Sequence, residues 1–444
     1  MQSNQQAPDE LTQAFAQALQ EQMARSPRLA PWLLRQGRVL LERFTHLYQA
    51  LRWLPRWMRR RWQRKLGASL AGVALALALN GAPAVYAAEI TVTTDVPAIN
   101  DGDGLCSLIE ALVNANNDGA TYADCDPGSE ADVITLAGGV YSLTGRQEGS
   151  NGLPIITSAI TIQGNNATIR RGTGNYRIIE VASTGDLTLN DTTISGGAQV
   201  RGGGIFNNGG VVTLNNSTVS GNGSQFEFGG GIFSQGTTTL NSSTVSGNTA
   251  AAGGGIFSNG GVVTLNNSTV SGNTTTFGWG GGINSQNGAL ILTNSTVSGN
   301  RAAEGYDGGG IYGRESIITL TNSTISNNRA DTGGGIFLLA SIGEVSTMRN
   351  TIIANNIGGD CVALIGSLEA SHSLIESGLG CVSGPKTGNL TGDPNLGPLQ
   401  DNGGPILTHA LLDGSPAIDA GDSTAALDAL GQPLTTDQRG PGFP

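Results

Sequence analysis

Short runs that alternate apolar and polar residues repeat along the middle of the chain, separated by glycine and asparagine. Gly-Gly-Gly-Ile occurs six times, and its isoleucines are Ile205, Ile232, Ile256, Ile283, Ile311 and Ile336. Each copy precedes a block of the form Leu-Asn-Asn-Ser-Thr-Val-Ser-Gly-Asn, whose last asparagines are Asn222, Asn248, Asn273, Asn300, Asn328 and Asn356. A regular period of about 25 residues is typical of a solenoid, in which each repeat forms one coil.

The runs inside each repeat favour strands over helices. Stretches such as 211–214 and 217–220 are rich in β-branched residues, and no longer stretch within a repeat has a helical pattern. We therefore predict an all-β fold, a right-handed parallel β-helix with three short strands per coil and coils stacked at ~4.8 Å. The isoleucines would fill the core, and the asparagines would form a ladder of side-chain hydrogen bonds.

The ends of a solenoid need covering, because open strand edges pair with other chains. Residues 107–114 predict a short N-terminal capping helix with apolar residues on one side. After Asn356 the repeat is lost, and a Gly-, Pro- and Asp-rich segment suits a C-terminal cap or appendage. The expected organisation is a basic extension with a signal peptide (1–87), a cap with the first strands (88–150), the repeats (151–356) and a C-terminal segment (357–444).

The N-terminal segment predicts export. A basic run at 59–65 precedes the apolar stretch 66–79, which is shorter than the ~20 residues of a membrane span. The apolar stretch is followed by Gly81 and Pro83, which end it, and by small residues up to Ala87. Together these features make the pattern of a secretory signal peptide. We expect cleavage after Ala87, or alternatively after Ala88. A retained membrane anchor is the other interpretation.

The four cysteines fall into two local pairs in the part expected to be exported. An even number in an oxidising compartment favours the disulfides Cys106–Cys125 and Cys361–Cys381. A zinc site is the weaker alternative, because no Cys-x-x-Cys spacing or nearby histidine cluster is present.

Composition and charge narrow the function classes. The chain has 68 glycines in 444 residues and only 13% charged residues, which argues against a large helical enzyme. Collagen is excluded because the glycines do not recur every third residue. Residues 89–444 hold 11 Lys and Arg against 30 Asp and Glu, a net charge of −19, so we expect no nucleic-acid partner. Membrane contact is expected only through export or an anchor.

Aromatic residues in two loops suggest a ligand-binding surface. Phe226 and Phe228 precede Gly229 at the same offsets at which Phe277 and Trp279 precede Gly280. If the loops align, these rings form two platforms two coils apart, or ~9.6 Å. Such platforms could stack on a linear glycan or dock on a surface protein. The alternative is that the rings only cover loop backbone.

One group of charged residues could carry an enzymatic reaction. Arg301 and Arg329 follow equivalent asparagines and should stack, and Glu304, Asp307 and Asp331 share their loops. Carboxylates that converge on neighbouring coils could serve a polysaccharide lyase or hydrolase. The alternative is a surface ion-pair ladder of little energetic value.

Other candidate chemistry is weaker, and we expect no cofactor or metal. His372 and His409 have no catalytic partner visible in the sequence, so a Ser-His-Asp site is not favoured. Calcium-binding nonapeptide repeats do not fit, because asparagine stands where aspartate is needed. Five aspartates crowd the cap without the spacing of an EF-hand, which favours solvated loops over a calcium site: Asp101, Asp103, Asp118, Asp124 and Asp126.

Three segments resemble families of exported β-helix proteins. Residues 106–112, Cys-Ser-Leu-Ile-Glu-Ala-Leu, resemble the CSLREA motif found near the start of such proteins. The Gly-Gly-Gly-Ile repeats resemble those of polymorphic outer membrane proteins. Residues 401–421 and 436–440 resemble the choice-of-anchor Q segment. The resemblance implies a surface or secreted β-helix and brings no established catalytic activity with it.

The sequence therefore favours an exported structural or adhesive module that binds glycans or surface partners. Its long face of repeated Ser, Thr and Asn side chains would suit weak multivalent contact. A glycan-active enzyme that uses the 301–331 loops is the alternative.

Overall fold

The computed structural model describes residues 88–224, 226–428 and 431–443. The described residues belong to the second of the two units into which the chain divides, Ala87–Pro444. The expected basic extension and signal peptide, residues 1–87, lie outside the described residues and stay a prediction. Within the described ranges, no helix is long and apolar enough to cross a membrane.

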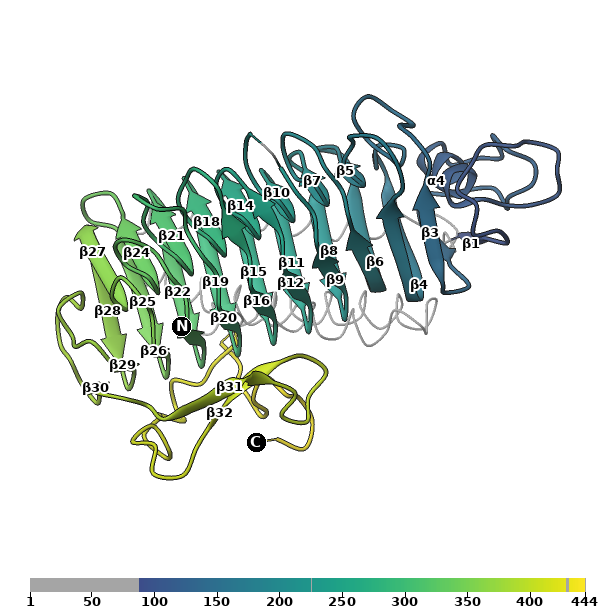
Figure 1. Cartoon of the computed structure of the whole chain (residues 1–444). Helices are drawn as coiled ribbons and strands as arrows, with labels where there is room; N and C mark the ends of the chain where they lie inside the picture. The colour runs from purple at the N-terminus through teal and green to yellow at the C-terminus, as the bar shows by residue number, and fades with distance from the viewer. Residues whose placement is uncertain (1–87, 225, 429–430, 444) are drawn as a thin grey trace, which may run out of the picture. The chain divides into compact units, whose positions relative to one another are not determined.

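The strands of the second unit wind into a parallel β-helix with three faces (Figure 1). Face 1 is a stack of strands whose partners lie in successive coils. Its members are β1 (Ala88–Thr91), β2 (Ala131–Thr135), β4 (Ala159–Arg171), β6 (Asp186–Ser195), β8 (Val211–Asn215), β11 (Thr237–Asn241), β15 (Val262–Asn266), β19 (Ala289–Thr293), β22 (Ile317–Thr321), β25 (Val345–Arg349) and β28 (Ser367–Ser371).

The shorter strands make the other two faces. Face 2 contains the second halves of β4 and β6 with β3 (Val140–Leu143), β9 (Thr218–Ser220), β12 (Thr244–Ser246), β16 (Thr269–Ser271), β20 (Thr296–Ser298), β23 (Thr324–Ser326), β26 (Ile352–Ala354), β29 (Leu374–Ile375) and β30 (Leu390–Thr391). Face 3 is an eight-stranded sheet of β5 (Ile179–Val181), β7 (Ile205–Asn207), β10 (Ile232–Ser234), β14 (Ile256–Asn259), β18 (Ile283–Gln286), β21 (Ile311–Arg314), β24 (Ile336–Leu339) and β27 (Cys361–Ile365). The parallel β-helix expected from the repeat is confirmed.

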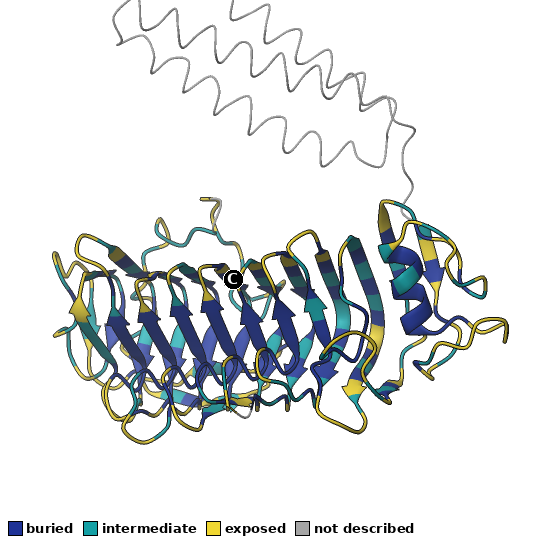
Figure 2. Cartoon of the chain, turned by 90° about the horizontal axis from the view of Figure 1, so that it is seen from above, coloured by how far each residue is buried: buried dark blue, intermediate teal, exposed yellow. Residues whose placement is uncertain are grey.

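The core lies inside the coil and is built from identical positions of successive repeats. Along β8 the alternation sends Val212 and Leu214 inward, where both are fully buried, while Thr213 faces out. Leu214 is aligned with Leu240 of the next coil, and the same register continues through the stack. The buried strand positions form one continuous apolar column (Figure 2). Each repeat thus adds its own layer to a single core.

Face 1 turns into face 2 through one residue in the left-handed region. Asn216, Asn267 and Asn294 all have φ values of 47–48° at this corner. Asparagine tolerates this conformation better than other residues with a side chain. The asparagine of the recurrent Asn-Ser pair therefore suits this corner, and Asp191, Ser242 and His372 take the same conformation in other coils.

The predicted asparagine ladder is present and buried. The Asn248 side chain donates from Nδ2 to Asn273 Oδ1 at 3.0 Å, and Asn273 donates in the same way to Asn300 at 2.9 Å. Each Oδ1 also accepts from the backbone N–H of the preceding asparagine, as Asn273 does from Asn248 at 2.9 Å. Asn273 is 0% exposed. The ladder satisfies buried polar groups that would otherwise be costly.

The N-terminal end carries the expected helix, α4 (Leu108–Asn116), beside the first strands of the stack (Figure 1). Ser107 and Glu110 form a capping box at its start. The disulfide Cys106–Cys125 ties the helix to the following loop, and Cys361–Cys381 closes the last coil, so both predicted disulfides are confirmed.

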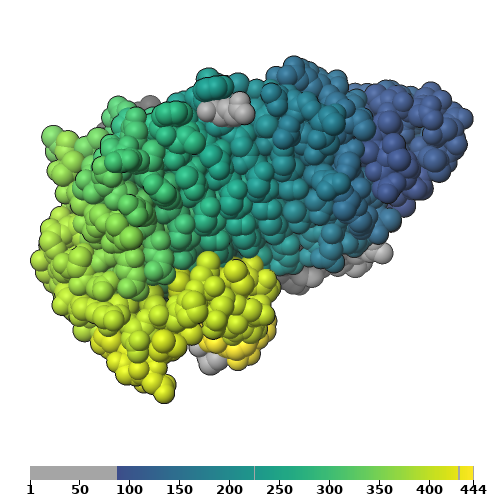
Figure 3. All heavy atoms as spheres, in the orientation of Figure 1, coloured from purple at the N-terminus to yellow at the C-terminus, as the bar shows by residue number. Residues whose placement is uncertain are grey.

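Solenoid strands continue beyond Asn356, where the regular repeat was expected to end. β27, β28 and β29 complete another coil although their sequence has lost the glycine-rich motif. Residues 392–428 and 431–443, which we call the C-terminal strap, then turn back along the side of the solenoid (Figure 3). The strap contains the antiparallel pair β31 (Leu396–Gln400) and β32 (Thr408–Leu411).

The strap is held on the outer side of face 2 by hydrogen bonds to the repeated hydroxyls. Thr269 donates to the carbonyl of Leu407 at 2.9 Å, and Thr296 bonds Gln438 at 2.6 Å. Thr296 is consequently 1% exposed, whereas the equivalent Thr218 of β9 is half-buried. At these coils the chain's own strap covers part of the long face of Ser, Thr and Asn side chains expected from the repeat.

Candidate functional site

The outer side of face 3 carries a column of aromatic rings. In each strand the first residue, an isoleucine in most coils, points into the core and the second points outward. The outward residues Phe206, Phe233 and Phe257 lie in register, and so do Tyr312 and Phe337. Neighbouring rings lie 5.4–5.5 Å apart between centroids, and the Phe233–Phe257 and Tyr312–Phe337 pairs are nearly parallel at 6°. All five rings are buried.

Two half-exposed rings from the adjoining loops lie on this column. Phe228 packs on Phe257 at 4.5 Å, and Trp279 stacks on Tyr312 at 5.7 Å with an interplanar angle of 28°. Phe228 and Trp279 are 36% and 40% exposed. The rings beneath them fix their orientation, so both platforms are preorganised for a ligand.

The expected alignment of the two aromatic loops is visible in the backbone. Phe228 pairs with Ala252 of the next coil, and Gly253 N–H donates to the carbonyl of Trp279 at 3.0 Å. Phe228, Ala252 and Trp279 therefore occupy successive coils, with the alanine between the two rings. This places the platforms two coils apart, or ~9.6 Å along the axis.

A column of polar side chains runs beside the aromatic one. Asn259, Gln286 and Arg314 occupy the fourth position of three successive strands and lie in register. They face outward next to the ring column because alternate residues of a strand share a side. The amides of Asn259 and Gln286 and the guanidinium of Arg314 thus lie along one side of this surface. The half-exposed rings of Phe228 and Trp279 lie along the other side.

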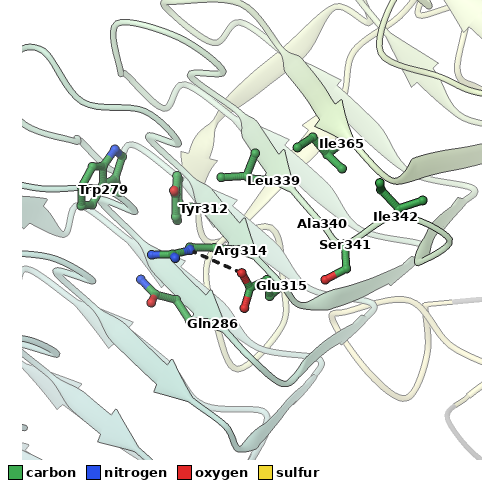
Figure 4. Close-up of a pocket in the computed structure, with 10 residues that line it drawn as sticks. All are labelled: Trp279, Gln286, Tyr312, Arg314, Glu315, Leu339, Ala340, Ser341, Ile342 and Ile365. Atoms are coloured by element: carbon green, nitrogen blue, oxygen red, sulfur yellow. Dashed lines mark ion pairs between the residues drawn. The ribbon is translucent and has the colours of Figure 1, made fainter.

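Between these two sides the surface is hollowed. One hollow of about 450 Å³ is bordered by Phe228 and Phe257, and a second of about 420 Å³ by Tyr312 and Leu339. Trp279, Gln286 and Arg314 border both (Figure 4). The two hollows adjoin at these three residues, and we call the surface that contains both the aromatic groove.

The structure separates the four aromatic residues singled out in the sequence. Phe228 and Trp279 line the aromatic groove, whereas Phe226 and Phe277 are 80% and 67% exposed and border neither hollow. The ring column itself was missed. Its signal is present in the sequence, because Phe or Tyr follows the isoleucine of Gly-Gly-Gly-Ile in five of six copies.

Within the charged loops at residues 301–331, Asp307 lies beside Trp279 of the aromatic groove. Arg301 pairs with Arg329 in register, as expected, and Gly305 N–H donates to Asp331 Oδ2 at 2.9 Å. Burial raises the pKa of the Asp307 carboxyl group, and hydrogen bonds from Thr332 and Trp279 partly offset this rise. Glu304 is exposed. The arrangement brings one partly buried carboxyl group, Asp307, next to Trp279.

The aspartates of the cap organise a loop. Asp124 Oδ2 accepts from the N–H groups of Gly102 and Asp103 at 2.5 and 3.0 Å. Across the described ranges, no group of three or more His, Cys, Asp and Glu side chains is placed to hold a metal ion.

The structure gives His409 a partner that the sequence did not reveal. Its Nε2 lies 2.9 Å from Ser298 Oγ, and its Nδ1 lies 2.7 Å from the carbonyl oxygen of Gly397. The pair resembles a nucleophile and its base, but Ser298 is 1% exposed beneath the strap. The contact therefore fastens the strap to face 2.

We expect acidification to loosen the strap through His409. Burial lowers the pKa of His409, so folding favours the neutral ring. This stabilisation is complete above the ordinary histidine pKa of ~6.5 and is lost as the pH falls towards the lowered value. Hydrogen exchange of residues 396–411, corrected for intrinsic rates, should be faster relative to the core at pH 5 than at pH 7. The His409→Gln variant should lose this difference, and His372→Gln should keep it; the opposite pattern would contradict the assignment.

The comparisons with known proteins concern the fold. Residues 205–375 match the family described as the right handed beta helix region. No curated protein matches the chain. The chain is similar to the crystal structure of pectate lyase Pel9A, with 12% identity, a TM-score of 0.35 and coverage of 69% of this chain and 75% of that chain. The family match and the parallel stacking of the strands show a right-handed parallel β-helix, with the hand expected from the sequence.

Proposed function

We propose that this β-helix is an exported, non-catalytic module that binds linear polysaccharides in the aromatic groove. The observation that carries the proposal is the pair of half-exposed rings, Phe228 and Trp279, held two coils apart on a column of buried rings. Aromatic faces offer large, rigid contact areas to the apolar faces of sugars, and the amides beside them can bond hydroxyl groups. A groove along the axis suits a polymer.

Export and surface action are part of the proposal. Two disulfides support an oxidising compartment, and the basic and apolar residues of the N-terminal segment support secretion. The resemblance to the CSLREA and choice-of-anchor Q families supports adhesion at a cell surface. If no glycan binds, a surface protein becomes the alternative partner of the module.

A second candidate function is cleavage of the bound polysaccharide. It is favoured by Asp307, whose pKa is raised by burial beside Trp279, since a protonated carboxyl group could act as a general acid. Glu304 and Asp331 would be its partners. The non-catalytic function is preferred because Glu304 is exposed and Asp331 bonds a backbone N–H.

One experiment separates the two functions. The full chain is tested against neutral and acidic polysaccharides by affinity gel electrophoresis, and the same mixtures are assayed for new reducing ends and unsaturated products. A binding module retards in the gel and releases nothing. Product release that disappears in both Glu304→Gln and Asp307→Asn would establish the enzyme instead. Neither retardation nor turnover with any polymer would contradict the proposal.

A further inference from the structure

We infer that the aromatic groove selects polysaccharides whose sugars carry carboxylates, and that Arg314 binds the carboxylate. This inference rests on the proposed function and adds the substrate class. Its central observation is that the polar column changes from amides to a single cation at Arg314, in register with Gln286. That cation borders both hollows of the groove (Figure 4).

Arg201 and Arg314 are the two arginines that border the hollows, and Arg314 is the one that the protein neutralises less. Arg201 is bound by Glu227 at 2.9 Å. Arg177 is bound by Glu180 at 3.3 Å and is nearly buried. Arg314 Nε lies 4.0 Å from Glu315 Oε1, and both side chains are half-exposed. Among the hydrogen bonds of the described residues, none engages the Arg314 guanidinium, so its donors are free for a ligand.

The chemistry of a guanidinium suits a carboxylate in particular. Its planar fork of N–H groups matches the two oxygens of a carboxylate, and such bonds are stronger than those between neutral groups. A neutral sugar would be served equally well by an amide, which the coil before Arg314 supplies as Gln286. Trp279 and Tyr312 lie beside the guanidinium (Figure 4), so a sugar stacked on Trp279 can place its carboxylate at Arg314.

The surrounding charges make this cation unusual. Residues 89–444 carry a net charge of −19 with a single lysine, so an acidic polymer is repelled by most of the surface. Glu315 and Asp307 add negative charge close to the site. Among the described residues, the Arg314 guanidinium is paired only with Glu315, at 4.0 Å, so an anion held in the groove can reach it. Glu315 competes for the guanidinium, so its removal should strengthen binding.

The test compares matched polymers that differ only in the group at C6 of each sugar, a carboxylate or a neutral primary alcohol. Polygalacturonate and its carboxyl-reduced counterpart are titrated into the full chain by calorimetry, with alginate as a second polyuronate. We expect the wild type to bind polygalacturonate about tenfold more tightly than the reduced polymer. Arg314→Gln, which copies the neighbouring coil, should lose this tenfold preference and keep the affinity for the reduced polymer. Glu315→Gln should raise affinity for the polyuronates alone.

The outcomes distinguish this inference from the proposed function. If the reduced polymer binds and Arg314→Gln weakens both polymers equally, or if the wild type shows no preference, the carboxylate assignment is wrong while the groove still binds glycans. If neither polymer binds the wild type but another neutral glycan does, the selectivity is likewise refuted. If no glycan binds, the proposed function falls and this inference falls with it.

Discussion

Replacing Asn273 with alanine should lower the free energy of unfolding by about 4 kcal/mol. The Asn273 side chain donates to the carbonyl of Val245 at 3.0 Å and to Asn300 Oδ1 at 2.9 Å. It also accepts from the Nδ2 and the backbone N–H of Asn248. The site is fully buried, so water cannot replace these partners, and the Asn248 N–H is left unsatisfied. The midpoint of urea unfolding, followed by circular dichroism, measures the loss.

A second asparagine ladder on the outside of the coil provides the control. Asn266 Nδ2 donates to Asn241 Oδ1 at 3.0 Å, but Asn266 is only half-buried. Water can satisfy its partner, so Asn266→Ala should cost less than about 1 kcal/mol. Equal losses from the inner and outer substitutions would show that burial of the ladder is not what stabilises the stack.

The Phe228→Ala, Trp279→Ala double variant should lose at least about thirtyfold in affinity for the polysaccharide that the wild type binds. These rings are the two half-exposed platforms of the groove, and their removal takes away the aromatic faces that project from it. Affinity gel electrophoresis of the full chain measures the loss. Circular dichroism must show that the β-helix is retained, because Phe228 also packs on Phe257.

The matched control removes the other two rings of the same loops. Phe226 and Phe277 are more exposed than Phe228 and Trp279 but lie outside the groove. The Phe226→Ala, Phe277→Ala variant should therefore bind as the wild type does. If this control loses affinity and the groove variant keeps it, the ligand lies on the loop tips instead.

Much of the fold could be predicted from the sequence, because each coil repeats the same physical demands. The isoleucine of Gly-Gly-Gly-Ile fills the core, and the last asparagine of the second block forms the ladder. Both are aligned from coil to coil, so the repeat itself predicts contacts between residues about 25 positions apart. The cysteine pairs were predictable for a similar reason, since each closes a short local loop.

The groove was only half predictable. Phe228 and Trp279, together with Phe226 and Phe277, stood out because they precede Gly229 and Gly280 at the same offsets. Phe233 and Phe257, one residue after the core isoleucine, look like core residues in sequence. The alternation of a strand turns them outward instead, where stacking on each other buries them. The sequence pattern shows the rings but not which side of the sheet they cover.

The strap was not predictable, because nothing in the repeat marks the coils that it covers. Thr269 and Thr296 contact the strap, and Thr218 has the same place in its own repeat without such a contact. The contact between Ser298 and His409 joins residues 111 positions apart in different kinds of segment. Only the three-dimensional path of the C-terminal segment brings them together.

The central claim, that the aromatic groove binds a linear polysaccharide, can be tested directly through Trp279. It is the only tryptophan among residues 88–444, so the difference in emission between the wild-type chain and Trp279→Phe reports on the groove. Our account predicts that a polysaccharide that retards the protein in a gel also shifts or quenches this difference emission, saturating at the same concentration. Retardation with unchanged Trp279 emission would place the ligand elsewhere and contradict the account.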